Sequence, residues 1–309
     1  MSYSKNYLTY LFGNKKNKKA KLPADIPWGS LTFEETLMFK TLMSDLDNYL
    51  LNLDFNTITE QDSYHLFKFF PFLKNKEVID KIKSRFQSGY DFYIKVTTKK
   101  NYINQDQLND LFNHLVSELT IFAVLNSNRK SPGYILIKDK NDEWVKNEWG
   151  EKWSIPILGM SSRGLDFYYT NGQTPQGVYE VLGVMPKADK YEEFGEYRRL
   201  IIDFKKNPEL VLPKSHHELI WWNEAILAKK LGRSHLRIHG AGRKKLNFFR
   251  SYFPFVPTSG CLATREGNFL FKCYNDQRLI LDQLMKAQGL EINFLNEMNI
   301  RANLIVVNF

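Results

Sequence analysis

The segments Ile238-His239-Gly240 and Thr258-Ser259-Gly260-Cys261-Leu262 organise the second half of this chain. The first ends an apolar stretch that is typical of a strand, and the second is a turn in which a glycine precedes a cysteine. Together they supply an imidazole and a thiol, the two groups that thiol nucleophilic catalysis requires. We therefore predict a fold that brings His239 next to Cys261.

A thiol at this position reacts only if its surroundings favour the thiolate form. A cysteine attacks as a thiolate and is mostly protonated near neutral pH, so a neighbouring base or positive charge must lower its pKa. His239 is the nearest base in the sequence, and the backbone N–H groups of Gly260 and Cys261 are suited to stabilise an oxyanion. Basic residues flank the pair on both sides: Arg243, Lys244, Lys245, Arg250 and Arg265.

Each of the two residues also has a simpler interpretation. A cysteine among apolar residues is usually an inert core residue, and a single histidine in a strand is usually structural. Cys261 and Cys273 are the only cysteines of the chain. Taken singly, neither His239 nor Cys261 indicates catalysis, so the interpretation depends on a third segment.

That segment is Thr174-Pro175-Gln176-Gly177-Val178-Tyr179-Glu180-Val181. It resembles the Thr-Pro-x-Gly-x-(aromatic)-x-(aliphatic) segment of the L,D-transpeptidase (YkuD-like) catalytic domain. In that family an Ile-His-Gly strand and a Ser-x-Gly-Cys turn follow, and both occur here in the same order. The resemblance rests on the ordered set and covers residues 133–309.

The resemblance implies a role for each matching position. Cys261 would be the nucleophile that accepts the acyl group, and His239 would be its general base. The Gly240 carbonyl would lie near the imidazole, and Ser259 and Gly260 would border the oxyanion site with Cys261. The family uses no metal and no organic cofactor, so none is expected.

The chain departs from the family pattern in the same region. Ser259 stands where the family often has histidine, and Ala263 stands where it often has arginine, so Arg265 is a possible substitute. The segment Leu246 to Val256 lengthens the gap between the imidazole and the thiol. Three residues are predicted to contribute to substrate binding: Thr258, Arg243 and Arg265.

The resemblance implies acyl transfer on peptidoglycan stem peptides. Cys261 would attack a carbonyl between an L-centre and a D-amino acid and form a thioester. An amine acceptor would then give a cross-link, as in an L,D-transpeptidase, and water would give an L,D-carboxypeptidase. Two other hypotheses stay open: a catalytically inactive wall-binding module, and a scaffold for a helical half that binds a protein partner.

Residues 1–127 are predicted to form an all-helical domain with a basic N-terminal tail. Thr32 and Glu35 form a capping box ahead of a first apolar stripe. Further helices are predicted over residues 60–70, 76–86 and 106–125, with a possible strand over 90–96. The domain is expected to dock on the catalytic domain or on a protein partner.

Residues 133–309 are predicted to form the catalytic domain, which is mainly β. Strands are expected over residues 134–137, 144–149, 153–158, 177–184, 236–239, 268–274 and 304–309. Helices are expected over 215–231, with a capping box at Ser215 and Glu218, and over 277–289. Cys273 is expected to be buried. The predicted fold class is α+β, an all-helical N-terminal domain followed by a mainly β L,D-transpeptidase-like domain.

Composition excludes several classes of protein. A chain of 309 residues with 43% hydrophobic residues is long enough for about two domains. The formal charge of +9 favours polyanions, but no nucleic-acid module or phosphate-binding glycine loop is recognisable. His235 and His239 have the spacing of a metal-ligand pair on a strand, yet a third ligand is missing. No apolar run in the sequence is long enough to span a bilayer.

The family resemblance and the N-terminal sequence favour different compartments. The resemblance implies the cell envelope or periplasm. Met1 to Gly13 is followed by a lysine-rich segment in place of an apolar core, so no export signal is expected in the sequence as given. A cytoplasmic relative that trims recycled wall peptides is the alternative.

Overall fold

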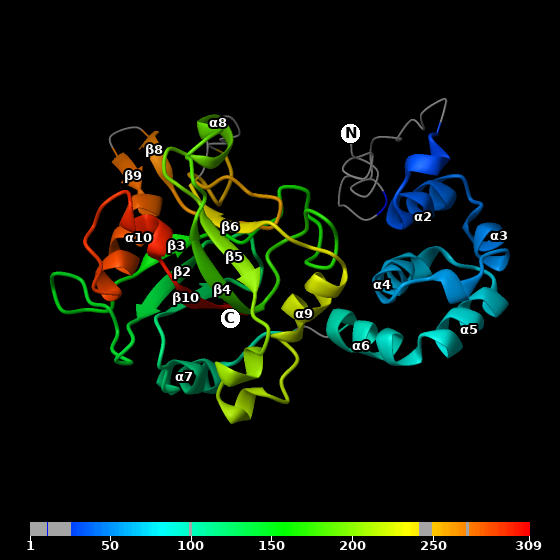
Figure 1. Cartoon of the computed structure of the whole chain (residues 1–309), viewed down its shortest axis with the longest axis horizontal. Coiled ribbons are helices and arrows are strands. Elements are labelled where there is room, and N and C mark those ends of the chain that lie inside the picture. Colours follow the sequence, from blue (N-terminus) through cyan, green and yellow to red (C-terminus); the bar gives the residue numbers. More distant parts are fainter. Residues whose placement is uncertain (1–10, 12–25, 99–100, 241–248, 270–271) are drawn as a thin grey trace.

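The computed structural model describes residue 11 and residues 26–98, 101–240, 249–269 and 272–309. Helices make up its N-terminal part and a large sheet dominates its C-terminal part (Figure 1). We call residues 26–98 the helical region and residues 101–309 the sheet region. The predicted α+β class is confirmed at this level.

The helical region consists of short helices, four of which lie in segments that the sequence predicts as helical. They are η1 (Trp28–Ser30), α2 (Phe33–Leu42), α3 (Leu46–Leu51), η2 (Phe55–Thr57), α4 (Glu60–Phe69), η3 (Phe70–Phe72), α5 (Lys76–Arg85) and α6 (Gln87–Thr98). The predicted capping box is present, because Glu35 N–H donates to Thr32 Oγ1 and Thr32 N–H donates to Glu35 Oε2. The possible strand over 90–96 is wrong. Tyr93 and Val96 are the buried residues of α6, three apart on one helical face.

The helix predicted from Asp106 to Leu125 is wrong in its second half. It ends after α7 (Gln105–Asn113), and the strand β1 (Thr120–Leu125) follows. Every residue of β1 is buried, so its continuous apolar run has no alternation that would distinguish it from a helix. The predicted domain boundary at 127–133 is therefore also wrong, because it separates β1 from its antiparallel neighbour β2 (Gly133–Lys138).

The main sheet has eight strands in the order β3-β2-β1-β10-β4-β5-β6-β7. Besides β1 and β2 these are β3 (Ile155–Ile157), β4 (Gly177–Val184), β5 (Leu200–Phe204), β6 (Leu236–His239), β7 (Leu262–Ala263) and β10 (Ala302–Asn308). The strand predicted at 304–309 lies in the middle of the sheet, where β10 pairs with β1 in parallel and with β4 in antiparallel orientation. Residues 144–149, predicted as a strand, make only isolated bridges.

Two further predictions are corrected near the cysteine turn. The single strand predicted over 268–274 is a hairpin of β8 (Glu266–Phe269) and β9 (Lys272–Asn275), and Cys273 is exposed in it. The helix predicted from Ser215 begins later, at α9 (Asn223–Lys230), after the short turn η5 (Lys214–His216).

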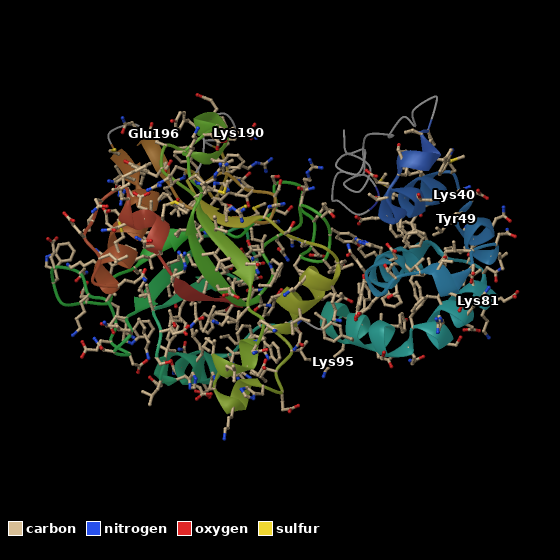
Figure 2. All side chains as sticks on the ribbon, viewed as in Figure 1. Lys40, Tyr49, Lys81, Lys95, Lys190 and Glu196 are labelled. Carbon is tan, nitrogen blue, oxygen red and sulfur yellow. The ribbon has the colours of Figure 1, made fainter. Side chains whose placement is uncertain are left out.

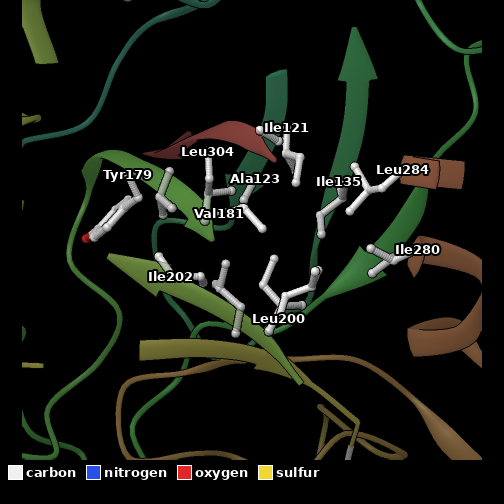
Figure 3. Packing of buried hydrophobic residues seen from close by; sticks show 14 of the residues in the cluster. Ile121, Ala123, Ile135, Tyr179, Val181, Leu200, Ile202, Ile280, Leu284 and Leu304 are labelled. Carbon is white, nitrogen blue, oxygen red and sulfur yellow. The ribbon is translucent and has the colours of Figure 1, made fainter. Parts of the chain in front are cut away.

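Both faces of the central strands are covered. On one face the helix α10 (Asp276–Ala287) packs Ile280 and Leu284 against the sheet, where Figure 3 shows Ile135 and Leu200 nearby. On the other face α7 and the loop before α9 supply a second apolar cluster with β1 and β10. Strand β6 lies toward the far edge of this sheet, next to β7.

The helical region shares its core with the sheet region. Phe167, Leu227 and Leu231 belong to the same buried cluster as the aromatic residues of α4. Leu227 lies on α9, which lies between the sheet and α6 in Figure 1. The helical region is therefore packed on α9 and on the loop that contains Phe167.

Candidate functional site

The pairing of β6 with β7 sets the relation between the imidazole and the thiol. The two strands are parallel, with Ile238 opposite Leu262 and His239 opposite Ala263. Cys261 stands immediately before β7, and its thiol lies near the backbone of His235 and Arg237, the segment that leads to His239. Thr264 N–H also donates to His239 O at 2.9 Å, which extends the pairing by one residue.

A cleft of about 830 Å³ contains both side chains in its lining. Thr258 and Ser259, predicted from the sequence, line it as well. A second wall comes from residues 162–171, and a third comes from the arm, residues 185–199, which connects β4 to β5 and carries α8 (Tyr191–Phe194). The structure thus brings together the predicted nucleophile, base and turn.

The imidazole of His239 is held in one tautomer. Its Nδ1 lies 2.6 Å from Gly240 O, and because a carbonyl only accepts, Nδ1 carries the proton and Nε2 keeps its lone pair. Burial lowers the pKa of His239 to about 4, the hydrogen bond to Gly240 opposes this shift, and the charge of Arg199 adds to it. His239 is therefore a neutral base at neutral pH.

The thiol of Cys261 is a protonated thiol at rest. Burial raises its pKa, against the Arg237 backbone N–H and the charges of Arg237, Arg233 and Arg199, which lower it. Its Sγ lies 3.9 Å from His235 O, and no hydrogen bond within the described part of the chain links it to the imidazole. A preformed thiolate–imidazolium pair is disfavoured, so a nucleophilic attack by this thiol would require its proton to move during the step.

The turn before the thiol is fixed by internal hydrogen bonds. Thr258 Oγ1 donates to Cys261 O at 2.5 Å and accepts from Gly260 N–H at 3.3 Å. The Gly260 N–H, predicted to face an oxyanion, is thus engaged by Thr258 in this structure. Gly260 has φ of 114°, and a Cβ there would overlap the guanidinium of Arg233. Only glycine satisfies both requirements.

Arg233 is a central residue of the site that the sequence did not indicate. The residue is 8% exposed, and its guanidinium donates to three carbonyl oxygens of the neighbouring loop. These are Phe167 O, Gln173 O at 2.8 Å and Gly172 O at 3.1 Å. Because it also fills the space beside Gly260, Arg233 joins this loop to the cysteine turn. No local sequence motif predicts this role, because the carbonyl groups that Arg233 contacts lie about 60 residues away in sequence.

The same loop is fixed from its other side by the helical region. Thr170, which lines the cleft, places its Oγ1 3.4 Å from Glu34 Oε2 of α2. Glu34 forms an ion pair with Lys68 of α4, which is 1% exposed. Although burial opposes it, the charge of Lys68 holds the pKa of Glu34 well below its usual range. One wall of the cleft therefore depends on a buried ion pair in the helical region.

Of the two arginines predicted to bind substrate, the structure describes only Arg265. Arg265 forms a two-contact ion pair with Asp276, its Nε 2.6 Å from Oδ2, and stacks on Tyr274, and it is not among the residues that line the cleft. Arg243 lies outside the described residues. Other basic residues line the cleft instead: Arg163, Lys190, Arg199, Arg233 and Arg237. Figure 2 labels Lys190 near α8.

The comparisons with known proteins do not assign a family. No family model matches the chain, and neither curated proteins nor solved structures gave a match. Within the described residues, no group of three His, Cys, Asp or Glu side chains is placed to hold a metal ion. Among the helices that the structure describes, none has the length and apolar character needed to cross a membrane.

Proposed function

We propose that this chain is a cysteine acyl-transferase that acts on peptidoglycan stem peptides in the manner of an L,D-transpeptidase. The observation that carries the proposal is the geometry of one cleft, which both Cys261 and His239 line and in which Nε2 of His239 has an available lone pair. The motif resemblance described above suggests the substrate class.

In the proposed reaction Cys261 Sγ attacks the carbonyl carbon that precedes a D-amino acid. The thiol proton moves to Nε2 of His239, and the imidazolium that forms is stabilised by the Gly240 carbonyl through Nδ1–H. Collapse of the tetrahedral intermediate breaks the peptide bond, and the proton on Nε2 passes to the departing amine. A thioester on Cys261 remains.

The charge of the cleft suits this substrate class. Stem peptides carry carboxylates, and Arg199 and Arg237 lie close enough to the thiol to affect its pKa. Arg199 pairs with Asp189 of the arm, so a substrate carboxylate would compete for an existing ion pair. Binding of the peptide would then replace an ion pair within the arm.

The fate of the thioester separates the main proposal from its alternative. An amine acceptor gives a cross-link, whereas water gives an L,D-carboxypeptidase. A substrate in the mature wall would place the protein in the envelope, and recycled wall peptides would place it in the cytoplasm. An inactive wall-binding module remains a second candidate, because the resting thiol is protonated.

Incubation with muropeptides that carry tetrapeptide stems tests the proposal. We expect loss of the terminal D-residue together with cross-linked dimers, as measured by mass spectrometry. Tripeptides without dimers would assign the carboxypeptidase instead. Cys261→Ala should abolish both products, and Cys273→Ala, at the exposed second cysteine, is the matched control that should retain them. Binding of the muropeptides without any product from the wild type would favour the inactive module.

A further inference from the structure

Glu266 places a buried carboxyl group behind the catalytic imidazole. It lies at the start of β8 and is 3% exposed. Its Oε2 accepts a hydrogen bond from Glu196 N–H at 2.7 Å, and the backbone of Tyr197 also bonds to the carboxyl. Its Oε1 has no hydrogen-bond partner among the described residues. Glu196 and Tyr197 belong to the arm, so this carboxyl fastens the arm to the hairpin.

Two glycines make room for this carboxyl. A Cβ at Gly240 would overlap Glu266 Cδ and both carboxyl oxygens, and a Cβ at Gly195 would overlap Oε2. The backbone of Gly240 therefore packs directly against the carboxyl group. Gly240 is also the residue whose carbonyl accepts the Nδ1 proton of His239.

The arm that Glu266 holds also reaches the imidazole. Phe194, at the end of α8, packs edge-on against the ring of His239 with 5.1 Å between ring centroids. The Gly240 carbonyl contacts the ring at Nδ1. A single carboxyl group thus supports both of the neighbours that orient the imidazole.

Within the described residues, Glu266 forms no ion pair. Arg265, the adjacent basic residue, is paired with Asp276, and Arg278 is paired with Asp282 and Glu297. Burial raises the pKa of Glu266 to about 7, against the hydrogen bond from the Glu196 backbone, which lowers it. The contacts of this buried carboxyl with the rest of the described structure are therefore its hydrogen bonds to the arm and its packing against Gly240 and Gly195.

We propose that Glu266 is a positioning residue for His239, which keeps the Gly240 carbonyl on Nδ1 and so keeps the Nε2 lone pair directed at the cleft. The catalytic consequence rests on the proposed function, whereas the positioning does not. Since Glu266 contacts neither the imidazole nor the thiol in the described hydrogen bonds, it acts through Gly240 and the arm.

Nitrogen-15 NMR of the histidine rings tests the positioning directly. Spectra are recorded at pH 8, above the pKa of Glu266, on the wild type and on three variants. Glu266→Gln keeps an oxygen that reaches the arm, Glu266→Asp withdraws it by one methylene, and Glu266→Ala removes it. We expect His239 in the Nδ1–H tautomer in the wild type and in Glu266→Gln, and a mixture of tautomers in the other two.

A matched control separates position from charge. Lys187→Gln removes an exposed charge on the same arm, and we expect the wild-type tautomer. A pure Nδ1–H tautomer in folded Glu266→Asp would overturn the proposal, even where Glu266→Ala fails to fold.

A kinetic measurement separates this inference from the proposed function. The rate at which a carbapenem acylates Cys261 should fall by up to about 100-fold in Glu266→Asp and recover in Glu266→Gln. No acylation of the wild type would end the enzyme proposal and leave the tautomer result standing. Acylation of the wild type with equal rates in all variants would show that Glu266 has no catalytic effect.

Discussion

At the scale of single residues, the site is a neutral imidazole beside a protonated thiol. His239 has its Nδ1 proton on Gly240 O, and burial lowers the pKa of its ring while it raises that of Cys261. These shifts favour general-base transfer over a resting ion pair. The sequence predicted both residues, because the motifs that carry them are local. It could not predict Arg233 or Glu266, whose roles arise only from contacts between distant segments.

The pKa of His239 provides a direct prediction at this scale. Because the folded protein disfavours the imidazolium, the ring should stay neutral down to about pH 5 and accept a proton only near pH 4. As the pH falls from about 6.5 to about 4, the unfolded chain binds this proton before the folded protein does. The free energy of unfolding should therefore decrease over this range. NMR titration of the ring checks this, and a midpoint near 6.5 would contradict it.

At the scale of elements, the main sheet includes strands whose own sequence does not identify them as strands. β1 was predicted as a helix because both of its faces are buried, and its continuous apolar sequence fits either element. β4 and β6, which carry parts of the motifs, have the bounds that the sequence predicts. The hairpin of β8 and β9 was not distinguished from one strand, so the position of Glu266 could not be foreseen.

The cysteine turn gives a prediction for an element. Gly260→Ala forces an L-residue into a φ of 114° and displaces the Arg233 guanidinium, so it should cost more than the roughly 1–3 kcal/mol of backbone strain alone and should slow acylation of Cys261. Gly150→Ala is the matched control, because Gly150 also has a positive φ, of 80°, but a Cβ added there would meet no other atom within 4 Å. Urea unfolding of both variants measures the change in stability, and their acylation rates measure the change in the reactivity of Cys261. Equal effects of the two variants would show that Arg233 does not fill the space beside the turn.

At the scale of the whole molecule, the helical region is part of the site. Its core includes Phe167 from the loop that Arg233 holds, and Glu34 of α2 contacts Thr170 at the cleft. The sequence predicted the helices but placed the domain boundary too late, and it offered no sign of this shared core. Binding of a separate partner by the helical region stays a hypothesis, although its contact with the cleft provides a route by which a partner would affect the site.

Removal of the buried cation tests this connection. Lys68→Met leaves the Glu34 carboxylate buried without its partner, which should destabilise the protein by about 3–5 kcal/mol and slow acylation of Cys261 through Thr170. The double variant Lys68→Met, Glu34→Leu should recover much of the stability, and Lys76→Met, at an exposed lysine of α5, should change little. Denaturant unfolding and acylation rates are the measurements. Unchanged acylation in a folded Lys68→Met protein would separate the helical region from the site.

Acylation of Cys261 by a carbapenem tests the central claim most directly, because a strained acyl donor requires only the nucleophile, its base and the oxyanion site. Intact-mass measurement of the wild type should show a single adduct, peptide mapping should place it on Cys261 and not on the exposed Cys273, and His239→Ala should slow its formation by about 100-fold or more. A folded wild type that stays unlabelled, or an adduct on Cys273 alone, would contradict the account.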